Sequence, residues 1–170
     1  MTNPAIPGFI LTSPDIDTVA LIAHKHVYNG FGYDGENVSP ALEWRGAPSG
    51  TKSFALTVHD PDAPTGSGWW HWVMVNIPVT TTALPQGAGN LETGKAPQGA
   101  RQIATDFGEP GWGGPCPPKG DEPHRYVFTL HALGVEALDL PENATPALVG
   151  FNLHFNTLAK ASFTARFGSK

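Results

Sequence analysis

Short runs of alternating or apolar residues, separated by clusters of Gly, Pro, Asn and Asp, recur along this chain of 170 residues. Runs of this length, rich in β-branched and aromatic residues, are typical of β-strands. Consecutive strands separated by short turns usually pair antiparallel. The pattern therefore predicts a mostly antiparallel β domain. We expect its strands at residues 9–12, 41–44, 53–60, 70–77 and 124–133.

One stretch near the C-terminus has a helical pattern instead. Thr145 is a suitable N-cap and Pro146 takes the first helical position, so we expect a helix from there to about Lys160. Its apolar residues recur at intervals of three or four and should pack on a sheet. They are Leu148, Phe151, Phe155 and Leu158. Between residues 78 and 123 neither pattern is strong, and we expect an ordered loop.

Composition limits the class of protein. A chain of this length forms one domain, here residues 1–170, and needs no disulfide or metal to fold. The single Cys116 cannot form an internal disulfide, and the N-terminus lacks a basic region followed by an apolar core, so we expect a cytoplasmic protein. The net charge of −5 argues against nucleic acid as a partner. No apolar run approaches the roughly 20 residues that span a bilayer.

Three strand ends carry the candidate chemistry. Side chains alternate along a strand, so Asp60 ends an apolar face, whereas His71 and His124 begin theirs. We expect the face of His71 to continue with Val73 and Val75. Antiparallel pairing makes Asp60 and His71 neighbours, and one sheet can bring all three polar residues to one edge of its core. Each alone is more often structural, but together they predict a small concave site.

A loop rich in glycine and proline, residues 113–120, precedes His124 directly. Proline has no N–H, so the inward-capable backbone donors of this loop are chiefly those of Gly114 and Cys116, on either side of Pro115. Glycine lets the backbone approach a ligand closely. The loop therefore predicts the mouth of an anion-binding pocket, although a plain lining role is the simpler interpretation of Cys116.

Four segments resemble the phosphatidylethanolamine-binding proteins, and within them the small bacterial type often called Raf-kinase-inhibitor-like. They are GENVSPALEW at residues 35–44, DPDAP at 60–64, HWVMVNI at 71–77, and GPCPPKG at 114–120 followed by HRY at 124–126. The resemblance implies a Greek-key fold of two antiparallel sheets with a C-terminal helix and short peripheral helices. It also implies a pocket for phosphate-type head groups. The ligand-binding residues carried over are Asp60, Asp62, His71, Gly114, Pro115, Cys116, His124 and Tyr126.

A carboxylate in an anion pocket needs a partner, because two negative charges repel strongly at close range. Asp60 can accept a hydrogen bond from His71 or His124 and so favour imidazolium, or it can be protonated and donate to the ligand itself. Both versions predict that anion affinity falls as the pH rises through the histidine pKa. Tyr126 can donate its hydroxyl to the same oxygens. We expect Arg125 to form an ion pair with Asp62 or a loop carboxylate.

These features favour a non-catalytic binding protein for small anionic or phosphorylated ligands, without cofactor or metal. No serine lies in a nucleophile elbow, and Cys116 has no helix N-terminus to activate it. The alternative is a hydrolase, or a metal-dependent enzyme, that uses Asp60, His71 and His124. The resemblance suggests a third role, regulation of a kinase or protease, and it implies a homodimer.

Overall fold

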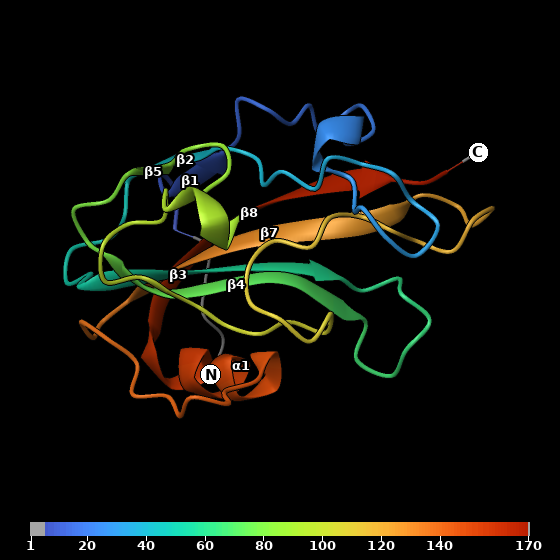
Figure 1. The fold of residues 1–170 in the computed structure, drawn as a ribbon. Coiled ribbons are helices and arrows are strands. Elements are labelled where there is room, and N and C mark those ends of the chain that lie inside the picture. Colours follow the sequence, from blue (N-terminus) through green and yellow to red (C-terminus); the bar gives the residue numbers. More distant parts are fainter. Residues whose placement is uncertain (1–5, 170) are drawn as a thin grey trace.

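The computed structural model describes residues 6–169, which form two antiparallel β-sheets and one α-helix (Figure 1). The larger sheet has the strand order β6-β4-β3-β7-β8. Its strands are β3 (Ser53–Asp60), β4 (Trp69–Pro78), β6 (Arg101–Gln102), β7 (His124–Leu133) and β8 (Thr157–Phe167). The smaller sheet, in the order β1-β2-β5, consists of β1 (Ile10–Thr12), β2 (Leu42–Arg45) and β5 (Ala83–Leu84). The predicted mostly β fold with two antiparallel sheets is confirmed.

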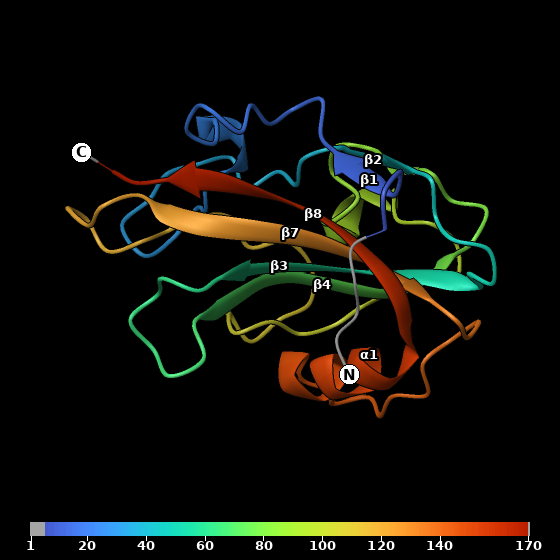
Figure 2. The same cartoon turned by 180° about the vertical axis from the view of Figure 1, so that it is seen from behind.

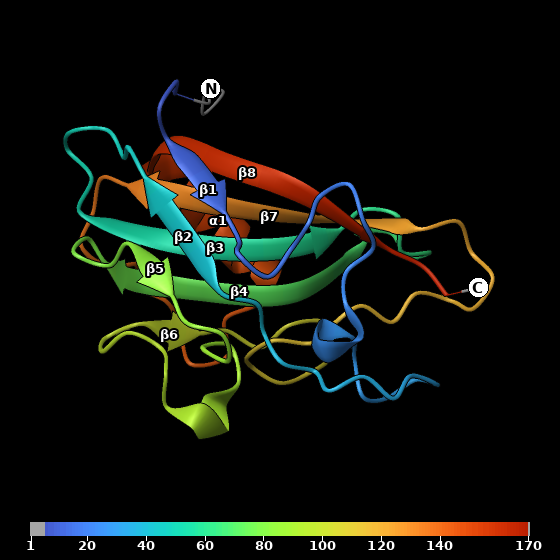
Figure 3. The ribbon, with the colours of Figure 1, turned by 90° about the horizontal axis from the view of Figure 1, so that it is seen from above.

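The larger sheet is the middle layer of the molecule. The smaller sheet covers one face and the helix α1 (Pro146–Asn156) covers the other, as the two opposite views in Figures 1 and 2 show. From above, β1 and β2 lie across the strands of the larger sheet (Figure 3). Two short 3₁₀ helices, η1 (His24–His26) and η2 (Leu91–Thr93), lie at the periphery. Each face of the larger sheet carries its own buried apolar cluster.

The C-terminal helix is shorter than its pattern predicts. Its start is as expected, because the Thr145 side chain accepts a hydrogen bond from the Leu148 N–H at 3.1 Å. It ends at Asn156, however, and Val149 and Leu153 are the helix residues buried against the sheet. The expected stripe is wrong beyond Leu148, since Phe151 and Phe155 are 63% and 69% exposed.

The residues after the helix form β8, a strand that the sequence pattern does not reveal. It pairs antiparallel with β7 from His124 opposite Phe167 to Leu133 opposite Thr157. Its inward positions include Ala159, Ala161 and Ala165, all buried. Alanine has a low β propensity and little apolar surface, so the period-two alternation of this strand carries a weak hydrophobic signal. Pairing with β7 decides its conformation.

The segment between β4 and β7 is ordered by short elements and side-chain hydrogen bonds. It contains β5, η2 and β6. Ser39 Oγ accepts from the Gly89 N–H at 2.8 Å, and the Asn90 amide donates to Asn37 O at 2.8 Å. These bonds attach the segment to residues 37–39. Within residues 6–169, no helix has the length and apolar character needed to cross a membrane.

Strand β4 contains an extra residue at His71. Val58 of β3 lies opposite Trp72, but His59 lies opposite Trp70, so His71 has no direct partner across the pair. Such a β-bulge shifts the alternation of the strand by one residue. The expectation that His71 shares a face with Val73 and Val75 is therefore wrong. Those two valines pack in the cluster on the α1 side.

Candidate ligand-binding pocket

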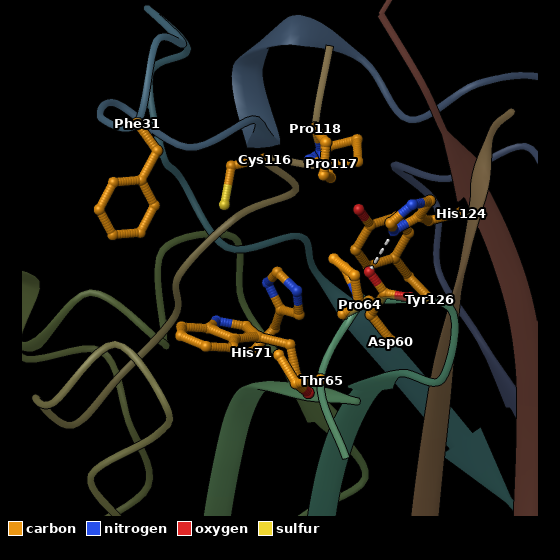
Figure 4. A pocket seen from close by; sticks show the side chains of 12 residues that line it. Phe31, Asp60, Pro64, Thr65, His71, Cys116, Pro117, Pro118, His124 and Tyr126 are labelled. Atoms are coloured by element: carbon orange, nitrogen blue, oxygen red, sulfur yellow. Dashed lines mark hydrogen bonds and ion pairs between the residues drawn. The ribbon is translucent and has the colours of Figure 1, made fainter. Parts of the chain in front are cut away.

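Ends of β3, β4 and β7 meet at a cavity of about 200 Å³ (Figure 4). The bulge turns His71 toward the same side as Asp60, and β7 brings His124 and Tyr126 beside them. Two loops, residues 61–68 and 113–123, complete the wall. The lining residues are Phe31, Asp60, Ala63, Pro64, Thr65, Trp69, His71, Cys116, Pro117, Pro118, His124 and Tyr126. The three polar strand ends thus lie in one cavity.

Two carboxylates hold the ring of His124. Nδ1 lies 2.7 Å from Asp60 Oδ2, and Nε2 lies 2.9 Å from Asp121 Oδ2. Only imidazolium donates from both ring nitrogens. Burial lowers the pKa of His124, but the hydrogen bonds to Asp60 and Asp121 outweigh it, so the pKa lies above the ordinary value. The sequence allows Asp60 to accept a hydrogen bond from His71 or His124, and in the structure it accepts from His124.

His71 is held in the neutral form. Its Nδ1 lies 2.7 Å from the carbonyl oxygen of Gly113, which can only accept, so Nδ1 carries the proton. Nε2 is therefore the unprotonated nitrogen. Burial lowers the pKa of His71 to about 4, and the hydrogen bond to Gly113 and the charge of Asp60 offset burial only in part. At neutral pH this histidine offers a lone pair and no charge.

Two buried donors of the cavity wall lack partners. The Tyr126 hydroxyl and the Trp69 indole N–H make no hydrogen bond with any residue in the described part of the chain. Burial raises the pKa of Tyr126 well above its usual range, so the hydroxyl keeps its proton. A buried donor without a partner costs about 1–3 kcal/mol. A ligand oxygen that reached either donor would relieve that cost.

The glycine and proline loop contributes less to the cavity than its sequence suggests. The Gly114 N–H donates to Asn37 Oδ1 at 2.8 Å, and Pro115 O accepts from the Tyr28 N–H at 3.1 Å. Both residues are buried behind the lining, so the Gly114 N–H is not available to a ligand. Gly114 is needed for packing, because a Cβ there would lie 2.0 Å from the backbone oxygen of His26.

Cys116 does line the cavity, as an unreactive thiol. Burial, aided by the charge of Asp60, raises the pKa of Cys116 to about 12. Thiolate is the nucleophilic form of cysteine, so this side chain stays protonated at neutral pH. It presents a small, weakly polar surface between Pro115 and Pro117.

Asp62 lies outside the cavity. Its carboxylate binds Arg125, with Nη2 2.8 Å from Oδ1, and also accepts from the Arg125 backbone N–H at 2.8 Å. The expected pairing of Arg125 with Asp62 is confirmed. These hydrogen bonds lower the pKa of Asp62 to about 2. Asp62 therefore ties the loop after β3 to the start of β7 and supports the cavity wall from behind.

Several contributors are not predicted from the sequence, among them Phe31 and Asp121. Phe31 lies at the mouth, 70% exposed and with φ of 53°, and packs against Phe107 with ring centroids 6.0 Å apart. Nothing in its glycine-rich surroundings signals this position. Asp121 is the second carboxylate on His124. Its spacing of three residues before the histidine was the available signal.

The fold and the cavity define a class of β protein with a small, built-in pocket at one end of its main sheet. Comparison with known proteins then gives the family. A family model described as phosphatidylethanolamine-binding protein matches residues 12–168, and the chain belongs to this family.

Relatives in bacteria are close. The chain is 55% identical over 157 residues to the UPF0098 protein YbhB of Escherichia coli K12, covering 92% of this chain and 98% of that protein. The crystal structure of E. coli YbcL, titled a new member of the mammalian PEBP family, aligns with a TM-score of 0.93. It shares 52% identity and covers 96% of this chain and 99% of that one. A homologue from Chlamydia trachomatis, CT736, aligns with a TM-score of 0.78 at 28% identity, covering 99% of this chain and all of that one.

Proposed function

We propose that this protein is a non-catalytic binding protein whose cavity holds a small anionic head group of the phosphate type, such as phosphoethanolamine or another phosphorylated ligand. The observation that carries the proposal is a set of polar groups among the residues that line one cavity. Tyr126 and Trp69 each have a buried donor without a partner, and His124 is an imidazolium at the same wall. Oxygens of an anion are the acceptors that Tyr126 and Trp69 lack, and an imidazolium beside them stabilises negative charge.

Charge balance in the cavity favours anions that arrive together with a proton. His124 is positive and Asp60 negative, whereas His71 is neutral. No surplus positive charge therefore faces the ligand. An anion oxygen beside His71 Nε2 needs a proton between the two atoms, supplied by the ligand's own acidic hydroxyl or taken up by the ring. Affinity accordingly rises as the pH falls.

The same geometry supports binding rather than turnover. The Cys116 thiol stays protonated, and the Thr65 hydroxyl donates to the backbone oxygen of Gly68. His124 uses both ring nitrogens on carboxylates, so it offers no lone pair as a general base or metal ligand. The free nitrogen of His71 makes no hydrogen bond to a thiol or hydroxyl of the described lining residues.

The mouth of the cavity suits an organic substituent on the head group. Phe31 and Trp69 line the cavity, and both carry aromatic faces. Aromatic faces attract alkylammonium groups by about 0.5–2 kcal/mol. An ethanolamine tail fits this arrangement.

Partner, assembly and location extend the proposal. A phosphorylated segment of a kinase or another protein would present the same head group, and binding of that segment would be the means of regulation.

The exposed Phe151 and Phe155, whose ring centroids are 5.2 Å apart, are the patch on which we place a homodimer contact. Light scattering of the wild type and a Phe151→Ser, Phe155→Ser variant tests it. The single free Cys116 suits a reducing cytoplasm, which cell fractionation tests.

The test of the proposed function is a titration followed by histidine NMR signals. Phosphate, phosphoethanolamine, acetate and a nucleotide are added to the wild type, to His124→Ala and to His24→Ala, which removes an exposed histidine of η1. We expect saturable shifts of His71 and His124 in the wild type and the His24 variant, and at least tenfold weaker binding in His124→Ala. Wild-type signals that do not move with any anion would refute the proposed function.

A further inference from the structure

One of the two carboxylates on His124 differs from the other in burial. Asp60 is 3% exposed at its side chain and His124 is 4% exposed, whereas the side chain of Asp121 is 44% exposed. Water therefore has access to the Asp121 carboxylate, whereas the contact between Nδ1 and Asp60 is shielded from it.

An anion that reaches His124 has one ring nitrogen to use. The ring lies between the cavity and a shallow depression on its outer side, which is lined by Asp62, Asp121, Glu122, Pro123, Arg125 and Arg166. Nδ1 is committed to Asp60. Any incoming oxygen can receive a hydrogen bond only from Nε2, the atom that Asp121 now occupies at 2.9 Å.

The net charge around His124 also opposes binding of an anion while Asp121 stays in place. With Asp60 and Asp121 ionised and His124 protonated, the cluster carries a net charge of −1, which repels a further anion at close range. Departure of Asp121 from the ring removes one negative charge from contact and frees one donor. The carboxylate of Asp121 thus imitates an anion ligand at the binding atom.

The loop that carries Asp121 is built so that this residue can leave. Pro117 is fixed from outside the loop, because Tyr33 Oη donates to its carbonyl oxygen at 2.7 Å. Beyond it, Lys119, Gly120, Asp121 and Glu122 are exposed, and Gly120 has φ of 89° at the turn. Movement of Asp121 therefore breaks the His124 contact and rearranges exposed residues while the roof of the cavity keeps its anchor.

We infer that Asp121 is a built-in competitor of the ligand, whose carboxylate must leave His124 Nε2 before an anion binds there with full strength. This inference rests on the proposed function and adds the regulation of that site. It sets a threshold for ligands, since weak acceptors cannot displace a carboxylate, whereas a phosphate group can. The opposite role is a positioning one, in which Asp121 keeps the ring charged and oriented for the ligand. The two roles predict opposite effects of removing the carboxylate.

The experiment compares Asp121→Ala with Glu122→Ala. Glu122 is the adjacent exposed carboxylate, so its removal changes the net charge equally, but it does not contact His124. The affinity for phosphoethanolamine is measured by calorimetry at low salt and at about 0.5 M KCl, where long-range effects are screened. We expect Asp121→Ala to bind about tenfold more tightly at both salt concentrations, the worth of one charge-assisted hydrogen bond that is partly exposed. The Glu122 variant should stay within about twofold of wild type in high salt.

Several results would overturn the inference. Equal gains in the two variants would mean that only overall charge matters, and unchanged or weaker binding in Asp121→Ala would assign Asp121 the positioning role. A second measurement needs no ligand. NMR titration should give a lower pKa for His124 in Asp121→Ala than in wild type, and an unchanged pKa would show that the contact does not exist in solution. If the wild type binds phosphoethanolamine but Asp121→Ala binds no better, the inference alone fails. If neither protein nor the Glu122 variant binds any anion, the proposed function fails with it.

Discussion

Replacing His71 with glutamine is expected to make the protein less sensitive to acid, even though the variant is less stable at neutral pH. The neutral His71 ring is buried, with Phe107 and Tyr126 packed edge-on at 5.4 and 5.1 Å. Protonation in the folded state places a charge in that site, whereas the unfolded chain takes up the same proton freely. Glutamine keeps an amide donor for Gly113 O and cannot be protonated.

The magnitude follows from the lowered pKa. The pKa of His71 falls from an ordinary value of 6.5 to about 4 in the folded protein. Above pH 6.5 the lowered pKa of His71 has almost no effect on the free energy of unfolding. The loss of unfolding free energy grows as the pH falls toward the pKa of the folded protein. Between about pH 7.5 and pH 4.5 the wild type should lose about 2.5 kcal/mol of unfolding free energy from this residue alone. His124 has a raised pKa and the opposite sign, because its contribution is present at low pH and is lost as the pH rises. It is common to both proteins and cancels in the comparison.

Urea unfolding followed by tryptophan fluorescence measures the difference. Wild type, His71→Gln and the exposed-site control His24→Gln are compared at about pH 7.5, 6.0 and 4.5. The gap between wild type and His71→Gln should narrow by about 2.5 kcal/mol across this range, and the gap to the control should stay constant. A narrowing below about 1 kcal/mol would refute the reasoning, since a unit of pKa corresponds to about 1.4 kcal/mol.

Three further outcomes are expected. In Gly114→Ala the added Cβ would lie 2.0 Å from a backbone oxygen, so thermal unfolding should show a loss on the order of 3 kcal/mol. Gly150→Ala, which has no atom within 4 Å of the new Cβ, should gain about 0.5–1 kcal/mol, and equal effects of the two would contradict the packing role. Arg125→Ala should let the pKa of Asp62 rise from about 2 toward its ordinary value, as measured by carboxyl NMR, and an unmoved pKa would exclude the ion pair in solution. Affinity for acetate should rise up to about tenfold for each unit of pH between 8 and 6. Acetate keeps its charge there, so calorimetry in two buffers counts the protons taken up, and a flat profile would argue against proton-coupled binding.

The parts of the fold that sequence predicts are those with strong apolar alternation. The strands expected at residues 53–60, 70–77 and 124–133 correspond to β3, β4 and β7, because their inward positions hold large side chains. The sequence pattern does not predict β8, because Ala159, Ala161 and Ala165 occupy its inward positions. Its neighbour β7, and not its own composition, makes it a strand. The helix was extended into β8 for the same reason, since Leu158 continues a helical spacing by chance.

The glycine and proline loop shows a different limit. Its glycines and prolines indicate a backbone that packs closely against a neighbour, but they do not show what that neighbour is. The sequence favours a close approach of Gly114 to a ligand, whereas the close approach is to the last residue of η1 and the two residues after it, within the protein itself. A glycine with no room for a Cβ looks the same in sequence whether the neighbour is a ligand or another part of the chain.

The convergence of Asp60, His71 and His124 depends on one inserted residue. By strict alternation His71 would face α1 with Val73 and Val75, on the opposite side of the sheet from Asp60. The bulge at His71 moves the ring to the cavity side while Trp72 and Met74 still fill the core between the sheets. Periodicity cannot reveal a bulge, because the residues on either side keep their alternating pattern, so the grouping of these side chains was correct while the face assigned to His71 was not. It follows that deleting Trp70, which does not line the cavity, should remove the bulge and turn His71 away from the cavity. The bulge is therefore required for the site as much as the histidine itself.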